Sequence, residues 1–478
     1  MSDCCQKENN QLIEYDLIVI GAGSGGFSAA ITAAEREKKV LLIGYGTIGG
    51  TCVNIGCVPS KTLIRGVELA HLAGQTKRFN GISSHAKIVD WGALIEQKKD
   101  LVDALRKAKY SDILPEYPNI TYLKGKAKLD KNANKTSVLV DGTHYHANHI
   151  IIATGSSNAI PPIKGLKEIN YLDSTALLDS KQLPESLLII GAGVIGCELG
   201  QAFSRAGVKV SICCRSRLLS NEEPEISDAL EGYFQEEGII VYKGIEYQEI
   251  KRCSNGYELS FANSTEKVCA EKVLVCTGRR PNTAALGCEE AGVKLNSKGG
   301  IEVNEYLNSS NPAIYAVGDV TGRDMFVYMA AYGAKLAVNN ALDRDAIPYD
   351  ASTMPVVAFT DPQVAHVGLT EKQALQAGFD VKTSVLPLSK VPRAIAARNT
   401  NGVIKLVADK KTDQLLGAHI CAQEAGDSVQ TAVLAIKAQM TSKELGDTVF
   451  PYLTMVEGLK LAAQTFDKDV NKLSCCAG

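Results

Sequence analysis

Two segments of the sequence repeat one pattern, in which a short apolar run leads into a glycine-rich turn and then into a helical stretch. The turns begin at Gly21 and Gly191, 170 residues apart, and both have the spacing GxGxxG. A strand, such a turn and a helix form the dinucleotide-binding fingerprint, because glycine permits the tight turn and lets the backbone approach a pyrophosphate at the helix N-terminus. The pattern predicts two nucleotide-binding domains, one of which could pass electrons to the other. The glycines that carry it are Gly21, Gly23 and Gly26 in the first turn and Gly191, Gly193 and Gly196 in the second.

Further apolar runs that end near glycine indicate the last strands of the two nucleotide-binding domains. One leads into Ala153, Thr154 and Gly155, another into Gly278, and a third ends at Asp319. From about residue 353, strand-like stretches precede a helical one without alternating with helices, which favours a separate α+β domain. The sequence thus predicts an α/β protein with two doubly wound, Rossmann-like dinucleotide-binding domains and a C-terminal α+β domain. We expect the first domain at 12–158 and 283–350, the second at 159–282 and the C-terminal domain at 351–478.

The composition and charge of the chain indicate which kinds of partner it lacks and in which compartment it is expected. The 478 residues carry a formal net charge of −2, which gives no indication of a nucleic acid or an anionic membrane as partner. No apolar run is long enough to span a bilayer, and the first eleven residues lack the pattern of a secretory signal, so we expect a cytoplasmic protein. Among 14 cysteines, Cys52 and Cys57 are separated by four residues and Cys475 and Cys476 are adjacent. In a reducing compartment such spacings point to redox or metal chemistry.

The first cysteine pair lies in the segment GGTCVNIGCVPSK, residues 49–61. Four intervening residues let two cysteines cycle between dithiol and disulfide, and a helix N-terminus stabilises a thiolate. The segment resembles the active site of the flavoprotein disulfide reductases, which include lipoamide dehydrogenase, glutathione reductase and mercuric reductase. This resemblance implies FAD in the first domain, a nicotinamide nucleotide in the second, and a homodimer formed through the third. It makes Cys57 the thiolate next to the flavin and Cys52 the thiol that exchanges with substrate, and it assigns Thr51 to cofactor binding.

The same resemblance pairs Lys61 with Glu198 beside the flavin, where the lysine favours negative charge on the reduced ring. Each of these residues on its own could equally be an ordinary surface charge. The nucleotide of the second domain can be typed at the end of the strand 208–214, where an acidic residue favours NAD and arginine accommodates the 2′-phosphate of NADP. Arg215 and Arg217 follow there without a carboxylate, so we predict NADPH, although arginines of a surface loop would look the same. In the first domain, Gly44 stands where an acidic residue for the adenosine ribose of FAD is expected, which puts one ribose contact in doubt.

The C-terminal region distinguishes between members of the family. Members that reduce organic disulfides have a histidine that protonates the leaving thiol, but here Tyr452 stands in its place, five residues before Glu457. A phenol is a poor proton shuttle at neutral pH, so lipoamide or glutathione reduction is disfavoured and remains the alternative. A metal-sequestering protein with a vestigial flavin is a second alternative.

Tyr452 and the tail cysteines together resemble the Hg(II)-reducing branch of the family, the mercuric reductases, in a form without the N-terminal metal-binding domain. In that branch the tail cysteines of one subunit deliver Hg(II) to the redox pair of the other, so the active site is shared within the homodimer. The implied reaction is NADPH-dependent reduction of thiol-bound Hg(II) to volatile Hg(0). Tyr452 would order or contact the metal, or would only fill space. The implied metal ligands are Cys52, Cys57, Cys475 and Cys476.

Overall fold

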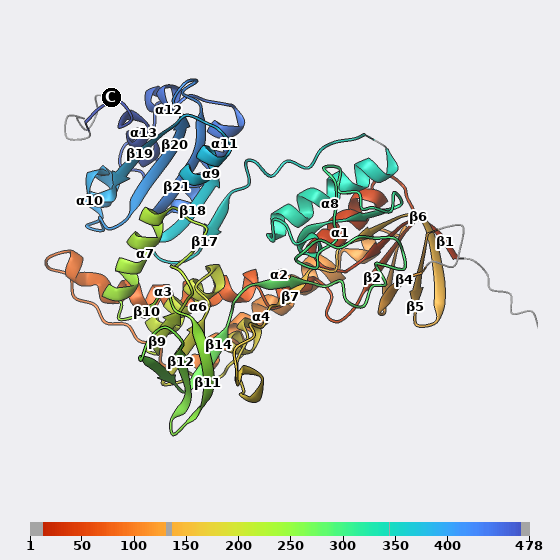
Figure 1. Ribbon diagram of the computed structural model, residues 1–478, viewed down its shortest axis with the longest axis horizontal. Coiled ribbons are helices and arrows are strands. Elements are labelled where there is room, and N and C mark those ends of the chain that lie inside the picture. Colours follow the sequence, from red (N-terminus) through yellow and green to blue (C-terminus); the bar gives the residue numbers. More distant parts are fainter. Residues whose placement is uncertain (1–12, 131–135, 344, 470–478) are drawn as a thin grey trace, which may run out of the picture. The chain divides into compact units, whose positions relative to one another are not determined.

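The computed structural model describes residues 13–130, 136–343 and 345–469, and Figure 1 shows their helices and strands. The chain divides into two compact units. The first comprises the described residues up to 58, 99–158 and 279–351, and the second comprises 59–98, 159–278 and those from 352 onward. The limits expected for the four domain segments remain a prediction.

The first unit is built on a mixed sheet with the strand order β3-β2-β1-β6-β5-β4, to which β16 adds by pairing with β6. Strands β3, β2, β1, β6 and β16 run parallel to one another, whereas β5 pairs antiparallel with β6, and β4 pairs antiparallel with β5. The strands of the sheet are β1 (Ile13–Ile20), β2 (Val40–Gly44), β3 (Ile120–Lys124), β4 (Ala127–Asp130), β5 (Ser137–Val140), β6 (Thr143–Ile152) and β16 (Ile314–Ala316). Beside it lie α1 (Ser24–Ala34) and α8 (Val327–Leu342), and the short helix α2 (Gly50–Asn54) follows β2 in the chain. Strands β7 (Ser156–Asn158) and β15 (Arg279–Pro281) form a separate pair.

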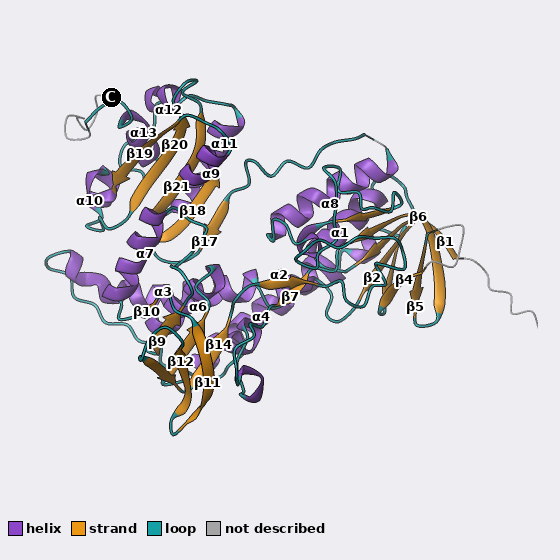
Figure 2. Cartoon of the chain, viewed as in Figure 1, coloured by secondary structure: helices purple, strands orange, loops and turns teal. Residues whose placement is uncertain are grey.

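Burial on both faces explains why the first strand is a continuous apolar run. Leu17 and Val19 pack into the cluster that includes residues of α1 and α8, the helices seen beside this sheet in Figure 2. Ile18 and Ile20 point to the opposite face and join a second cluster. Because side chains alternate between the faces of a strand, a strand covered on both sides has no polar position left.

The second unit contains a parallel sheet with the order β10-β9-β8-β14. An antiparallel meander, β11-β12-β13, connects β10 to β14 and takes the place of a crossover helix. The elements are β8 (Ser186–Ile190), α6 (Val194–Arg205), β9 (Lys209–Cys213), α7 (Pro224–Glu236), β10 (Ile240–Tyr242), β11 (Tyr247–Cys253), β12 (Gly256–Phe261), β13 (Lys267–Ala270) and β14 (Lys272–Val275). Helices α3 (Cys57–Gly74) and α4 (Trp91–Arg106) each have residues in both units.

The C-terminal segment of the second unit forms a five-stranded antiparallel sheet, β17-β18-β21-β20-β19, with helices after and between its strands. The antiparallel pairing of this sheet and the parallel strands around each glycine turn together confirm the predicted fold class. The elements are β17 (Val356–Ala358), β18 (Gln363–Gly368), α9 (Glu371–Gln376), β19 (Val381–Pro387), α10 (Pro392–Ala396), β20 (Val403–Asp409), β21 (Leu415–Ala422), α11 (Ala425–Lys437), α12 (Ser442–Asp447) and α13 (Glu457–Gln464).

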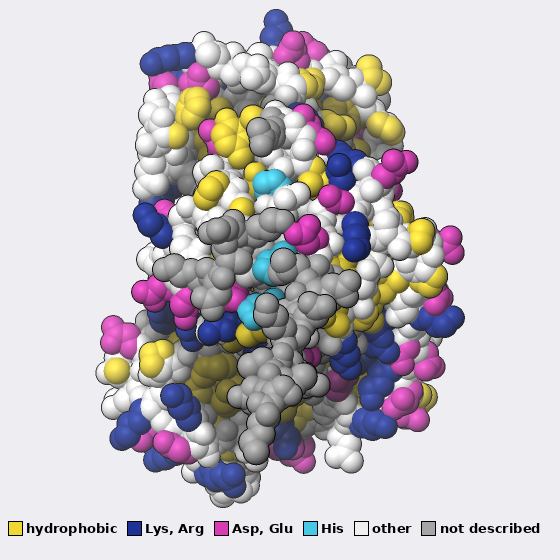
Figure 3. All heavy atoms as spheres, turned by 90° about the vertical axis from the view of Figure 1, so that its right-hand side faces the viewer, with side chains coloured by type: hydrophobic (Ala, Val, Ile, Leu, Met, Phe, Trp, Pro, Cys, Tyr) yellow, Lys and Arg dark blue, Asp and Glu magenta, His cyan; other side chains and the backbone are white. Residues whose placement is uncertain are grey.

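Acidic and basic side chains are interspersed on the face shown in Figure 3, as the near-zero net charge leads one to expect. Among the described residues, every helix is too short or too polar to cross a membrane.

Candidate active site

The first glycine turn connects β1 to α1 and requires glycine at two positions for lack of space. A Cβ at Gly21, where φ is +116°, would lie 2.2 Å from the carbonyl oxygen of Ala153, and a Cβ at Gly26 would collide with the carbonyl oxygen of Gly21. The N-cap residue of α1, Gly23, has no side chain to cap the helix, so the first N–H groups of α1 remain available to an anion. This arrangement fits the pyrophosphate of a dinucleotide.

Residues that follow β6 close the first turn from the other side. The backbone N–H of Ala153 donates to the carbonyl of Ile20 at 2.7 Å. Next to it, the Thr154 hydroxyl donates to the Asn282 carbonyl, and a Cβ at Gly155 would meet only open space. The predicted residues 153–155 therefore lie against the glycine turn.

The second turn repeats this construction between β8 and α6. A Cβ at Gly191 would lie 2.5 Å from the carbonyl oxygen of Cys276, and a Cβ at Gly196 would lie 2.2 Å from that of Gly191. Gly193 is the N-cap of α6 and has no side chain to cap the helix. A Cβ at Gly193, or at Gly278 beyond β14, would meet only open space. The geometry suits close approach of a second nucleotide phosphate.

The cysteine segment is fastened directly to the first glycine turn. The N–H of Gly49 donates to the carbonyl of Ala22 at 2.9 Å, and a Cβ at Gly50 would come within 2.6 Å of the Cα of Gly23. The Asn54 side chain donates to two carbonyls of the same loop at 2.8 Å. The dithiol segment is thus held against the place where the sequence predicts FAD.

Cys52 lies in α2, after the exposed Thr51, and Cys57 is the first residue of α3. Both cysteine side chains are half-buried. A helix N-terminus favours an anion, so the position of Cys57 suits the thiolate that the resemblance implies.

Two tyrosines near the thiols were not predicted from the sequence. Burial raises the pKa of the Tyr110 phenol, and Cys52 and Cys57 lie close enough that their charges would raise it further. The Tyr110 hydroxyl shares a 3.1 Å hydrogen bond with Ser24, at the first turn of α1. Burial likewise raises the pKa of Tyr328, with Cys57 nearby. Both phenols lie far from the cysteines in sequence and in no motif, so only the fold reveals them.

Lys61 and Glu198 form an ion pair within the second unit. The Lys61 Nζ lies 2.7 Å from one carboxylate oxygen of Glu198, and the backbone N–H of Phe359 donates to the other oxygen at 2.8 Å. Glu198 is only 3% exposed, and the ammonium of Lys61 also lies 4.9 Å from the Phe359 ring centroid. The structure thus brings these two predicted residues together in the lining of one pocket, while their place beside a flavin remains a prediction.

The remaining predicted residues differ in how firmly they are held. Arg215 is exposed, whereas Arg217 donates to the Glu222 carbonyl at 2.6 Å and to Ser227. Asp319 accepts a 2.6 Å hydrogen bond from the Ser156 hydroxyl.

In the C-terminal segment, Tyr452 is 49% exposed, and the nearby Glu457 is buried and accepts from the Leu453 N–H. Cys475 and Cys476 lie outside the described residues.

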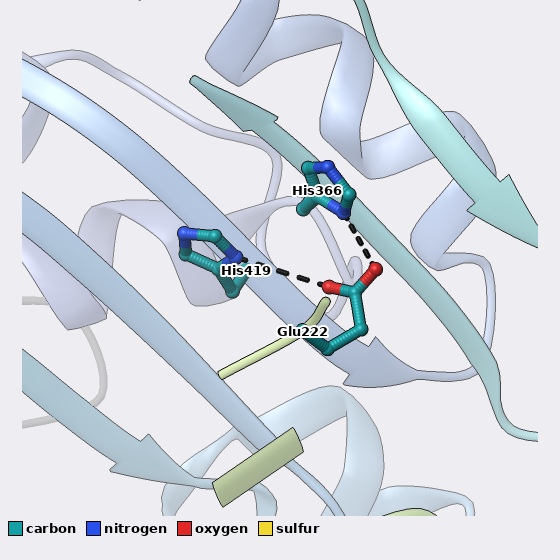
Figure 4. Close-up of side chains that lie close together, drawn as sticks. All are labelled: Glu222, His366 and His419. Carbon is teal, nitrogen blue, oxygen red and sulfur yellow. Dashed lines mark hydrogen bonds and ion pairs between the residues drawn. The ribbon is translucent and has the colours of Figure 1, made fainter. Parts of the chain in front are cut away.

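A cluster that the sequence analysis did not identify joins Glu222 to two histidines (Figure 4). Its ligand atoms lie within 4.8 Å of one another, a set that could in principle hold a divalent cation. However, the distance between a Glu222 carboxylate oxygen and the Nδ1 of His366 is 2.7 Å. This distance is shorter than the roughly 3.3 Å between two ligand atoms of a tetrahedral zinc. The spacing fits a hydrogen-bonded ion pair, to which the fully buried His419 contributes Nδ1 at 3.9 Å.

Comparison with known sequence families accounts for most of the chain. Residues 15–335 match the family described as "Pyridine nucleotide-disulphide oxidoreductase", and residues 354–463 match the dimerisation domain of that family. The chain belongs to this family. It is therefore an oxidoreductase, and its C-terminal sheet is the part that members of the family use to dimerise.

Curated relatives within the family are similar over nearly the whole chain. A protein named mercuric reductase from Staphylococcus aureus is 47% identical over 97% of this chain and 85% of its own length. A protein of the same name from Streptomyces lividans is 45% identical over 97% of this chain and 98% of its own length.

Among solved structures, the Cu(II) complex of the HOCl-induced flavoprotein disulfide reductase RclA from Escherichia coli is 29% identical. It has a TM-score of 0.83 and covers 95% of this chain and all of its own. LpdA from Mycobacterium tuberculosis, at 24% identity and a TM-score of 0.84, shares the fold.

Proposed function

We propose that this oxidoreductase is a mercury(II) reductase that uses NADPH and FAD to convert Hg(II) into volatile Hg(0). The observation that carries the proposal is identity of 44–47% over nearly the full chain to several proteins named mercuric reductase. The cysteine segment against the first glycine turn supports it, because redox activity of Cys52 and Cys57 would then take place beside a nucleotide-binding element.

Two groups of residues would hold the cofactors. The space at the glycine turns fits two dinucleotides, and bound FAD would accept electrons from NADPH and supply two of them to the metal. For FAD these residues are Gly21, Gly23, Gly26, Thr51, Lys61, Ala153, Thr154, Gly155 and Asp319, and for NADPH they are Gly191, Gly193, Gly196, Arg215, Arg217 and Gly278.

Thiolates explain how the chain would handle the substrate. Hg(II) is a soft cation that prefers sulfur, and it can pass between thiolate pairs as each new Hg–S bond forms and an old one breaks. We propose that Cys475 and Cys476 of one subunit deliver Hg(II) to Cys52 and Cys57 of its partner in a homodimer. The half-exposed Tyr452 would contact the metal during this transfer.

The cytoplasm is our proposed location, because thiols are kept reduced there and could bind the metal as thiolates. Reduction of an organic disulfide is the competing activity. Against it, the residue five positions before the buried Glu457 is Tyr452, which is a poor proton donor to a leaving thiolate at neutral pH.

The deciding assay compares NADPH oxidation with and without Hg(II) in the presence of excess small thiol, with detection of elemental mercury vapour. Cys52→Ser and Cys57→Ser should each reduce the mercury-dependent rate to background. Cys269→Ser removes an exposed thiol on β13 and should leave the rate unchanged. Mercury turnover by the Cys52→Ser/Cys57→Ser double variant at the parental rate would overturn the mechanism, and faster reduction of lipoamide or glutathione disulfide would favour the competing activity.

A further inference from the structure

The carboxyl end of β2 lacks the acidic residue that usually contacts an adenosine ribose in this kind of domain. The strand ends at Gly44, is parallel to β1, and so reaches the same edge of the sheet as the glycine turn. An adenosine whose pyrophosphate lies on that turn would have its ribose near this edge. A hydrogen-bonding group for the ribose must therefore be supplied by a residue other than Gly44.

Space, not backbone conformation, explains the glycine. Gly44 is absent from the described residues with positive φ, so other amino acids could adopt its backbone. A Cβ built on it, however, would lie 2.6 Å from the Tyr122 hydroxyl oxygen and 2.9 Å from a carbon of the Tyr122 ring. It would also lie 2.8 Å from the Cβ of Ala22, within the glycine turn. The tyrosine thus occupies the space where a carboxylate side chain at position 44 would begin.

Strand pairing brings this tyrosine to the site. Tyr122 lies in the middle of β3, which is parallel to β2 and aligns Tyr122 with Leu42. Its ring packs against the buried cluster beside α1, while no hydrogen bond of its hydroxyl is found among the described residues. Burial raises the pKa of Tyr122, so at neutral pH the group is a hydroxyl that can both donate and accept.

We propose that the Tyr122 hydroxyl replaces the missing carboxylate and hydrogen-bonds to the adenosine ribose of FAD. The inference rests on the proposed function for the identity of the cofactor. A neutral hydrogen bond contributes less than one to a charged group, so the exchange of a carboxylate for a phenol retains ribose recognition at lower strength.

The test measures which cofactor the holoenzyme prefers. FAD competes with an analogue whose adenosine lacks the ribose 2′-hydroxyl, and the bound fraction of each gives the ratio of the two dissociation constants. The wild-type protein should prefer FAD by about 3- to 10-fold, the range expected for one neutral hydrogen bond. Tyr122→Phe should release FAD faster on dilution and show a ratio near one. Tyr117→Phe, which removes a phenol bonded to Glu35 at 3.5 Å, should behave like the wild type.

A swap of the two positions provides a second, independent readout. Gly44→Glu alone should lose FAD because its side chain collides with Tyr122, whereas Gly44→Glu combined with Tyr122→Ala should recover part of the FAD binding, because only the 2.8 Å contact with the Cβ of Ala22 remains. Equal preference ratios in wild type and Tyr122→Phe would overturn this inference. Purified wild-type protein that binds no FAD would instead overturn the proposed function.

Discussion

The buried carboxylate of Glu222 should make the second unit sensitive to acid. Burial alone would raise its pKa, but hydrogen bonds and the charges of His366 and His419 outweigh burial and lower it from 4.5 to about 2. A difference of two to three pKa units between the unfolded and folded states corresponds to about 3 kcal/mol of stability at pH 6. Because the folded-state pKa is the lower one, this stability is present above pH 4.5 and is lost as the pH falls towards 2.

Glu222→Gln should therefore lower the free energy of unfolding by up to about 3 kcal/mol at pH 6 and by much less at pH 3. The single tryptophan, Trp91, provides the readout, because it is buried in the second unit and donates to the Ser180 carbonyl. Urea unfolding followed by its fluorescence compares the variant and wild type at both pH values. Glu236→Gln is the matched control, since this exposed carboxylate ends α7.

Exposed surface charges contribute little, so the Glu236 variant should change the unfolding free energy by less than about 0.5 kcal/mol. An equal loss of stability at pH 6 and pH 3 in Glu222→Gln would refute the electrostatic argument. It would indicate that the residue acts through shape and packing alone.

Three further predictions concern the cofactor sites. Gly50→Ala should lower the melting temperature and the FAD content, because φ there is +67° and the new Cβ would collide with the first glycine turn. Gly46→Ala, also at positive φ but in open space, should lower both by less. Glu198→Gln should cost about 1.5–3 kcal/mol in thermal or urea unfolding, because the carboxylate 2.7 Å from Lys61 becomes a neutral amide. Arg215→Ala should raise KM for NADPH by about tenfold, the loss of one charge-assisted hydrogen bond, and leave KM for NADH unchanged.

The parallel strands next to the glycine turns could be predicted because burial on both faces imposes a continuous apolar run. Residues 17–20 and 187–190 follow this rule and form β1 and β8. The meander strand 247–253 was not predicted, because its sequence YQEIKRC buries one residue and leaves the others at least partly exposed. The same holds for 381–387, whose burial is uneven. Strands with little buried area leave a weak periodic signal, and their pairing depends on neighbours distant in sequence.

The residues of the candidate site also differ in whether a short segment of sequence or only the fold reveals them. Gly21, Gly191, Cys52 and Cys57 could be predicted as candidates because a glycine turn or a redox spacing is a property of one short segment. Tyr110 belongs to no such segment, and the fold alone brings it to the thiols.

The exchange at Gly44 shows why a departure from a motif should be interpreted in three dimensions. From the sequence, a glycine in place of an acid indicates a lost contact and weaker binding of FAD. In the structure, the space next to Gly44 is filled by Tyr122, 78 residues later and on the neighbouring strand. A glycine at position 44 and a large residue at position 122 therefore depend on each other. A carboxylate side chain at position 44 would not fit beside Tyr122, and a glycine there without Tyr122 would leave the space empty and the ribose without a hydrogen bond. Single substitutions at either position should harm cofactor binding more than the paired exchange.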